Sequence, residues 1–245
     1  MSQLDLTHPA CCDPLRAECL AAGFDLFQPA RVGWYNDAVD PAYRLPALGS
    51  PDSLALVIGN TRALWPRFLE AVAADPDLRA ARDPLDAYTV RVISRAAATL
   101  PHPYEVRFSH EPPPRRVAMQ RLAHVSGLAY LSPSFMCVHP VFGPWIALRA
   151  VVVVPVPGPD SPAPTWDAPC ACAGHCEDRF RQACELVARR EERGRAARDD
   201  WRAWLAVRDA CPVGRAHRYS DEQIAYHYTK DRSILAATGR PSRQT

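Results

Sequence analysis

The chain has 245 residues, with 29 basic and 27 acidic side chains and a formal net charge of +2 at pH 7. This length is enough for one large domain or two small ones and for a sizeable core. A near-neutral chain without a long Lys/Arg run is not expected to bind nucleic acid. No stretch reaches the roughly 18 uninterrupted apolar residues of a membrane span, and the N-terminus lacks a secretion pattern. We therefore expect a cytoplasmic protein, in which the nine cysteines are thiols or metal ligands rather than disulfides.

Hydrophobic periodicity and turn residues predict an α+β fold. The expected elements, in chain order, are a helix over 13–22, a strand over 24–33, an irregular segment over 34–46, a strand over 54–58, helices over 62–74 and 84–100, a strand over 104–109, a helix over 115–131, a strand over 145–156, one or two helices over 177–208, and a short helix ending near Tyr228. Residues 240–245 are expected to form a disordered tail.

The stretch 145–156 is almost continuously apolar and β-branched, which is typical of a strand covered on both faces. We predict it as the central strand. Strand alternation places Arg149 and Val151 on one face, and Leu148 and Ala150 on the other. Because burying a charge is costly without a partner, Arg149 should meet an anion. That anion is either an acidic side chain of the protein or a carboxylate or phosphate of a ligand.

Two histidines are candidates for a site. His124 lies on the predicted helix 115–131, and His139 lies in a turn just before the central strand. Each is either a core histidine with one polar partner or a side chain that faces a ligand. In the turn after His139, Gly143 allows the backbone to approach a neighbour closely.

Several blocks of the sequence occur together in one known family. They are Gly23-Phe-Asp-Leu-Phe-Gln-Pro29, Val32-Gly-Trp-Tyr-Asn36, Asp83-Pro-Leu-Asp86, Ala123-His-Val-Ser-Gly-Leu-Ala-Tyr130 and Cys137-Val-His-Pro-Val-Phe-Gly-Pro-Trp-Ile-Ala-Leu-Arg149. In this order they closely resemble the CblC-type cobalamin-processing proteins (MMACHC family). The resemblance covers the chain from about Gly23 to about Gly239.

This resemblance implies a single domain over 1–239 with a flavin-reductase or nitroreductase-like α+β fold, in which a mixed sheet is flanked by helices. It also implies that cobalamin, with its lower base detached, binds in a cavity above the sheet. Members of the family remove the upper ligand of cobalamin (vitamin B12). Cyanide is lost reductively with reduced flavin (FMN or FAD), and alkyl groups are transferred to the thiolate of glutathione.

Site residues can be carried over from the family by position. The resemblance assigns glutathione binding to Arg149, Arg208 and Arg232, with Arg149 and Arg208 as the catalytic pair. An arginine held in a strand is a preorganised fork for a glutathione carboxylate. The residues expected around cobalamin are His124, Cys137, His139, Gly143 and Trp145.

The resemblance also bears on partners. In the family, a proline-arginine loop reaches into a partner subunit, and its approximate counterpart here is 112–116, which makes a homodimer plausible. A flavin reductase or a cobalamin-trafficking protein is another possible partner. Animal members have a long polar insertion that is reduced here to residues 131–136, so contacts from that wall of the cavity are not carried over.

The cysteines after the proline-rich segment 157–169, which we interpret as a linker, suggest a second feature. Cys170, Cys172, Cys176 and Cys184 lie close together in sequence and predict either a zinc or iron–sulfur site or a set of free thiols. Two alternatives to a cobalamin-processing enzyme therefore stay open. One is a non-catalytic cobalamin carrier, and the other is an iron–sulfur enzyme of the epoxyqueuosine-reductase type.

Overall fold

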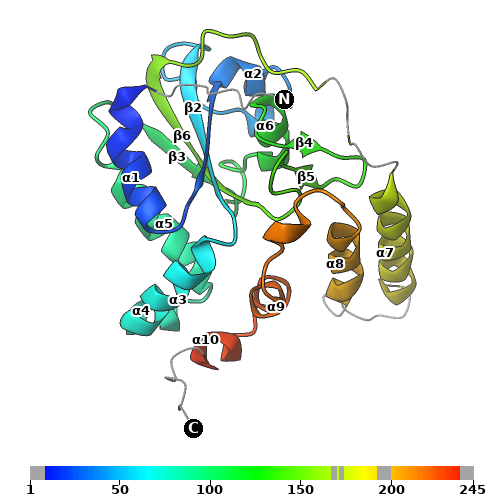
Figure 1. Cartoon of the computed structure of the whole chain (residues 1–245). Helices are drawn as coiled ribbons and strands as arrows, with labels where there is room; N and C mark the ends of the chain where they lie inside the picture. The colour runs from blue at the N-terminus through cyan, green and yellow to red at the C-terminus, as the bar shows by residue number, and fades with distance from the viewer. Residues whose placement is uncertain (1–8, 167–169, 171–173, 192–199, 238–245) are drawn as a thin grey trace.

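The computed structural model describes residues 9–166, 170, 174–191 and 200–237 (Figure 1). The helices are α1 (Asp13–Ala21), α2 (Val32–Asn36), α3 (Leu64–Ala74), α4 (Pro76–Ala80), α5 (Pro84–Ala97), α6 (Met119–Val125), α7 (His175–Glu191), α8 (Trp201–Asp209), α9 (Asp221–Thr229) and α10 (Ser233–Ala237), with 3₁₀ turns at Ala10–Cys12, Pro41–Tyr43 and Arg215–His217. The strands are β1 (Leu26–Arg31), β2 (Ser53–Asn60), β3 (Glu105–Phe108), β4 (Tyr130–Leu131), β5 (Cys137–Val138) and β6 (Ala147–Pro157).

The main sheet has the strand order β1-β2-β6-β3, and every neighbouring pair is antiparallel. The predicted strand over 145–156 is therefore confirmed as an interior strand, β6. The α+β class is also confirmed, but the described sheet is antiparallel rather than mixed. A second, two-stranded sheet joins β4 and β5.

Helices cover both faces of the sheet, with α1 and α5 on one side and α6 on the other (Figure 1). One face of β2 presents Leu56 and Ile58 to a core shared with α1, α3 and α5. The opposite face presents Ala55 and Val57 to a core shared with α2 and α6. This double cover explains why β2 and β6 consist of continuous apolar runs rather than alternating polar and apolar residues.

Arg149 lies at a β-bulge in β6. Ile58 of β2 pairs with Ala150, whereas the next residue, Gly59, pairs with Leu148, so Arg149 has no opposite residue on β2. The predicted alternation is therefore wrong at this point. Leu148 packs with Val151 on one face, and Ala150 belongs to the core on the other. Bulges of this kind redirect a side chain and are frequent next to functional sites.

The predicted helix over 115–131 is mostly wrong, because α6 ends at Val125. Gly127 follows the helix with φ +81° and donates its N–H to His124 O at 3.1 Å, as expected for a glycine after a helix C-terminus. The chain then continues into β4. The irregular segment over 34–46 is also partly wrong, since its first residues complete helix α2.

The stretch 177–208 forms two helices. Helices α7 and α8 pack on each other beside the sheet, and α9 lies between α8 and α3 (Figure 1). Among the described residues, no helix combines the length and the apolar character needed to cross a membrane.

The core prediction concerns Leu56, which is fully buried on β2. Replacing Leu56 with Ala should lower the free energy of unfolding by about 3 kcal/mol, because it removes apolar contacts and leaves a cavity. Urea denaturation measures this change, which should appear in the midpoint without a change in slope. The matched control is Leu20→Ala on α1, where the side chain is 48% exposed and a change below about 0.5 kcal/mol is expected. Equal changes in the free energy of unfolding at the two positions would contradict the burial of Leu56 in the core.

Candidate functional site

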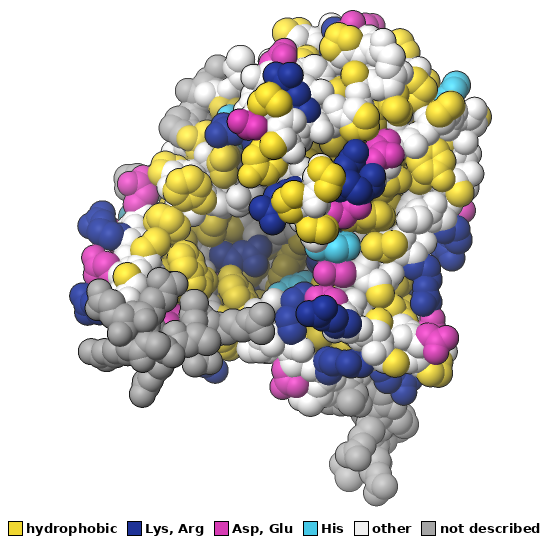
Figure 2. All heavy atoms as spheres, turned by 180° about the vertical axis from the view of Figure 1, so that it is seen from behind, with side chains coloured by type: hydrophobic (Ala, Val, Ile, Leu, Met, Phe, Trp, Pro, Cys, Tyr) yellow, Lys and Arg dark blue, Asp and Glu magenta, His cyan; other side chains and the backbone are white. Residues whose placement is uncertain are grey.

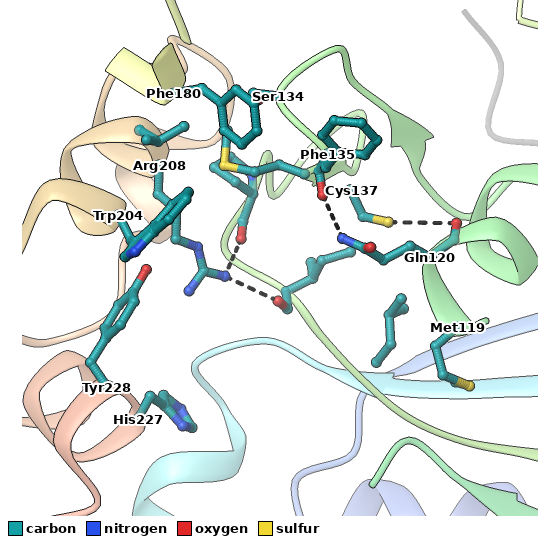
Figure 3. Close-up of a pocket in the computed structure, with 15 residues that line it drawn as sticks. Met119, Gln120, Ser134, Phe135, Cys137, Phe180, Trp204, Arg208, His227 and Tyr228 are labelled. Carbon is teal, nitrogen blue, oxygen red and sulfur yellow. Dashed lines mark hydrogen bonds between the residues drawn. The ribbon is translucent and has the colours of Figure 1, made fainter. Parts of the chain in front are cut away.

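A cavity of about 580 Å³ lies between the sheet region and helices α7 to α9. Figure 2 shows it as a hollow with mostly hydrophobic walls and with basic side chains at its floor. Ile146 and Leu148 line it from the beginning of β6, and Met119 lines it from α6. Opposite them, Phe180 and Trp204 belong to α7 and α8 (Figure 3). Walls of this composition suit a large, mainly apolar ligand.

Aromatic rings continue along the helical wall to the opening. The Phe180 ring lies 6.0 Å from that of Trp204 and 5.7 Å from that of Phe135. Phe135 is 64% exposed and has φ +58°. On α9, Tyr228 stacks on Trp201, with ring centroids 5.6 Å apart and an angle of 25° between the ring planes. A flat ligand edge can therefore contact ring faces along most of this wall.

Arg208 lies at the polar end of the cavity, in the last turn of α8. Its Nη2 donates to Pro144 O at 2.5 Å and to Ile146 O at 3.3 Å (Figure 3). Its guanidinium lies over the Trp145 ring at 5.1 Å. These contacts fix the head group, because the backbone oxygens and the ring face hold it on two sides. Because the backbone oxygens are neutral, the guanidinium keeps its positive charge where it lines the cavity.

Arg149 is held by an amide rather than by a carboxylate. Its Nε donates to Asn60 Oδ1 at 2.7 Å, and Asn60 Nδ2 donates to Thr61 O at 2.7 Å. The N–H and the hydroxyl of Thr61 in turn donate to Asp25 at 2.7 and 2.5 Å. This chain of bonds orients Asn60 and, through it, the guanidinium.

No acidic side chain among the described residues forms an ion pair with Arg149. Its side chain is buried, and its Nη2 has no hydrogen-bond partner within the described structure. Of the two partners expected from the sequence, an acidic residue of the protein is therefore not found there, and a ligand anion remains. Burial lowers the pKa of Arg149, but an arginine stays charged at neutral pH. An unpaired buried charge of this kind is costly unless a ligand meets it.

Two further side chains at this end of the site supply hydrogen-bond donors. The Tyr219 hydroxyl is buried without a partner in the described residues, and burial raises its pKa to about 12, so it remains protonated. His227 lines the cavity, and its pKa is well below the usual value because of burial and of the nearby Arg149 and Arg208. It is therefore neutral at pH 7. Arg149 and Arg208 both act electrostatically on Tyr219 and His227, and Arg208 and His227 line the cavity. Positive charges with neutral donors near them make this group a candidate site for an anion.

Cys137 is the second predicted residue that lines the cavity, beside Arg208. Burial raises the pKa of its thiol to about 12, and its Sγ contacts Gln120 O at 3.7 Å. Trp145 does not line the cavity. It is 1% exposed and packs edge to face against Tyr219 at 5.7 Å, so it supports Arg208 from behind.

His139 and Gly143 also lie outside the cavity lining, in the turn that precedes β6. The His139 Nδ1 accepts from the backbone N–H groups of Val141 and Phe142 at 3.0 and 3.2 Å. Gly143 has φ +57°, and a Cβ there would lie 2.0 Å from Val213 O. Both residues shape the turn that brings the strand against the loop before α9.

His124 faces a second cavity, of about 550 Å³. Its ring stacks on Trp166 at 5.7 Å, its Nδ1 accepts from Leu131 N at 3.1 Å, and Trp166 Nε1 donates to His124 O at 2.9 Å. The described part of the segment 157–169, which we expected to be a linker, thus packs on α6. Phe135 lines both cavities and separates them.

Arg232 is exposed and donates through Nη2 to the backbone oxygen of Arg79 in α4. Arg232, the third arginine that the resemblance assigned to glutathione, therefore does not line the cavity.

The predicted metal ligands are not assembled in the part of the chain that the structure describes. Cys172 lies outside the described residues. Cys176 is buried beside Ser134 Oγ at 3.3 Å, whereas Cys184 is exposed. They lie eight residues apart on α7, which is roughly 12 Å along a helix axis, too far for one metal ion. Within the described ranges, no group of three or more His, Cys, Asp or Glu side chains is arranged to hold a metal ion.

Sequence reasoning missed Asn60, Tyr219, His227 and Tyr228. Asn60 is a polar residue at the end of a buried apolar strand, which is a usable signal. The others lie on or beside a short helix whose inward face cannot be known before its packing is known.

Fold and site together define a class: a small α+β protein in which an antiparallel sheet and a helical wall enclose an apolar cavity with a cationic end. Residues 23–236 match the profile of the methylmalonic aciduria and homocystinuria type C family, MMACHC. The chain belongs to this family.

Individual relatives agree with this assignment. The cyanocobalamin reductase / alkylcobalamin dealkylase of Homo sapiens is 32% identical over 242 residues, covering 89% of this chain and 77% of that protein. Its counterpart from Danio rerio is 29% identical over 241 residues, with 87% and 86% covered. Among solved structures, the C. elegans B12-trafficking protein CblC superposes with a TM-score of 0.69 at 18% identity, covering 96% and 99% of the two chains. That likeness shows a shared fold.

The thiol chemistry of the cavity can be tested directly. At pH 8 a thiol with a pKa of about 12 is a thiolate in only about one molecule in ten thousand, so Cys137 should react slowly with iodoacetamide. The exposed Cys184 should be alkylated first. Peptide mass spectrometry over a time course measures both sites, with urea-denatured protein as the control in which the two react alike. Comparable rates in the folded protein would contradict the burial of Cys137.

Proposed function

We propose that this protein removes the upper axial ligand of cobalamin. Cyanide leaves reductively, and alkyl groups pass to the thiolate of glutathione. The observation that carries this proposal is the unpaired buried guanidinium of Arg149, which lies behind the lining of an apolar cavity and whose charge acts, with that of the cavity-lining Arg208, on His227 and Tyr219. It is supported by membership of a family whose relatives are named cyanocobalamin reductase / alkylcobalamin dealkylase.

The apolar part of the cavity suits the corrin substrate. A corrin is a broad, flat ring, and the cavity offers aliphatic side chains on one wall and ring faces on the other. Cobalamin is larger than the enclosed volume, but the hollow is open to solvent (Figure 2), and Phe135 of its lining is 64% exposed, so the ligand can extend outward. Aromatic contact along the helical wall would orient the ring.

The cationic end suits glutathione, which carries two carboxylates. A carboxylate bound by Arg149 Nη2 and by Arg208 would satisfy the unpaired donor and compensate the buried charge. The same positive charges lower the pKa of a nearby thiol and so favour the thiolate. In the transfer step the thiolate sulfur bonds to the alkyl carbon while the cobalt–carbon bond breaks. The electron pair of the broken cobalt–carbon bond stays on cobalt, and the products are a thioether and cob(I)alamin.

Several finer features belong to the same proposal. Reduced FMN or FAD would supply electrons for decyanation, within a nitroreductase-like fold, and we assign no residue to flavin binding. We also propose a cytoplasmic location and a homodimer formed through the loop 112–116. In that loop Arg115 is fixed by Glu105 and Glu111 at 2.6 and 2.7 Å, which would give a partner subunit a rigid surface.

The test of this function is a visible absorption spectrum of the protein with methylcobalamin, before and after glutathione is added. A shift to the base-off spectrum, followed by conversion to cob(I)alamin or its oxidised product, supports the enzyme. A base-off shift without conversion would instead support a carrier or a different thiol. No shift at all would contradict cobalamin binding.

Arg149→Gln should separate the two substrates. The glutamine amide can still donate to Asn60 and removes an unpaired buried charge, so folding should survive. The KM for glutathione should rise about 10- to 100-fold, as expected for the loss of a charge-assisted hydrogen bond. The Kd for methylcobalamin should change less than about threefold.

The matched control for this experiment is Arg232→Gln, at an exposed position outside the cavity, which should leave both constants unchanged. Equal loss of cobalamin and glutathione binding in Arg149→Gln would mean that Arg149 is a structural residue.

A further inference from the structure

The anion site at the end of the cavity has two arginines, and Arg232 does not join them. On α9, His227 and Tyr228 line the same cavity as Arg208 (Figure 3), and the charges of both Arg149 and Arg208 act on His227. His227 is neither a predicted site residue nor part of the mechanism above. Its ring lies where it could donate a hydrogen bond to a bound anion.

The hydrogen bonds of His227 fix its tautomer. Gln223 Nε2 lies 3.3 Å from His227 Nε2, one helical turn away on α9. An amide nitrogen only donates, so the ring nitrogen accepts and the imidazole proton lies on Nδ1. Gln223 is itself 1% exposed, and its N–H donates to the N-cap hydroxyl of Ser220 at 3.2 Å. The donor that sets the tautomer is therefore held in place.

The surroundings keep the ring neutral. Burial lowers its pKa well below the usual value, and the charges of Arg149, Arg208 and Lys230 act in the same direction. The ring is packed among Trp65, Tyr219 and Tyr226, at centroid distances of 6.2, 5.6 and 6.2 Å. A neutral donor can stand beside two guanidinium groups without repulsion, and it adds a hydrogen bond to any anion that they attract.

Nδ1 has no hydrogen-bond partner among the described residues, and two other donors of the site, Arg149 Nη2 and the Tyr219 hydroxyl, are buried without one. We propose that His227 is the third group that binds the acidic thiol cosubstrate, donating from Nδ1 to the carboxylate held by Arg149 and Arg208. This inference rests on the proposed function and assigns His227 the binding role that the resemblance gave to Arg232.

The experiment compares side chains that keep or lose a donor at Nδ1. His227→Asn places its amide nitrogen near the Nδ1 position, whereas His227→Gln places it near Nε2 and His227→Phe has no donor. The probe is S-methylglutathione, which has both carboxylates and no free thiol, titrated into the protein and followed by calorimetry. The Gln and Phe variants should bind it about tenfold more weakly or worse, and the Asn variant within about threefold of the parent.

A neutral thiol provides the second measurement. Dealkylation of methylcobalamin by 2-mercaptoethanol, which has no carboxylate, is the comparison: in the Gln and Phe variants the loss of rate with glutathione, at a concentration below its KM, should exceed the loss with 2-mercaptoethanol. If the Phe variant does not fold, the comparison of Asn with Gln still decides. Equal binding of S-methylglutathione by the parent, Asn and Gln proteins would overturn the role of His227, and so would a parent protein that does not bind this probe.

Different results would contradict the binding role of His227 and the proposed dealkylase function. If the parent protein binds S-methylglutathione through His227 but glutathione does not dealkylate methylcobalamin, the binding role stands and the proposed function fails. If glutathione dealkylates methylcobalamin with the same KM in the parent and Gln proteins, the proposed function stands and His227 is not a ligand of the cosubstrate.

Discussion

The hydrogen bond from Arg149 Nε to Asn60 Oδ1 is the contact on which the site depends. It holds a buried guanidinium at 2.7 Å with a neutral acceptor, so the charge is oriented but not neutralised. An ion pair with Asp or Glu would stabilise the fold more directly, but it would also fill the position that a ligand anion can take. The bulge in β6 makes this geometry possible, because it moves Arg149 out of the regular pairing with β2.

The cavity is assembled from two parts of the chain that are distant in sequence. The sheet and α6 supply the aliphatic wall, and α7 to α9 supply the aromatic wall. The parts meet where Arg208 bonds to the backbone before β6 and where Trp145 packs against Tyr219. Gly143 contributes at the same junction, because its missing side chain allows the turn to contact Val213. The residues that join the two walls thus also position the Arg208 guanidinium.

The sequence was most informative where a local pattern determines the structure. The apolar run of β6 predicted an interior strand, and Asp83 before Pro84 predicted the start of α5, where its side chain accepts from Asp86 N. Patterns failed where tertiary pairing intervenes. Alternation in β6 ignored the bulge at Arg149, and the apolar stripe of 115–131 hid the turn at Gly127.

The site was predictable to a similar extent. Arg208 and Cys137 line one cavity, and their predicted binding roles stay predictions. His227 could not have been chosen, because only the packing of α9 turns that face inward. His124 faces a second cavity, where Trp166, on a segment expected to be a linker, packs on its ring.

The burial of Cys137 has a consequence for any protein that handles alkyl donors. Electrophilic alkyl groups react with thiolates. A deprotonated cysteine in a cavity that binds an alkyl donor would compete for the alkyl group, and its alkylation would inactivate the protein. By raising the pKa of this half-buried thiol to about 12, the apolar wall keeps it protonated and so slows its reaction with any electrophile that enters the cavity. Desolvation thus lets a cysteine line the cavity without acting as a nucleophile there.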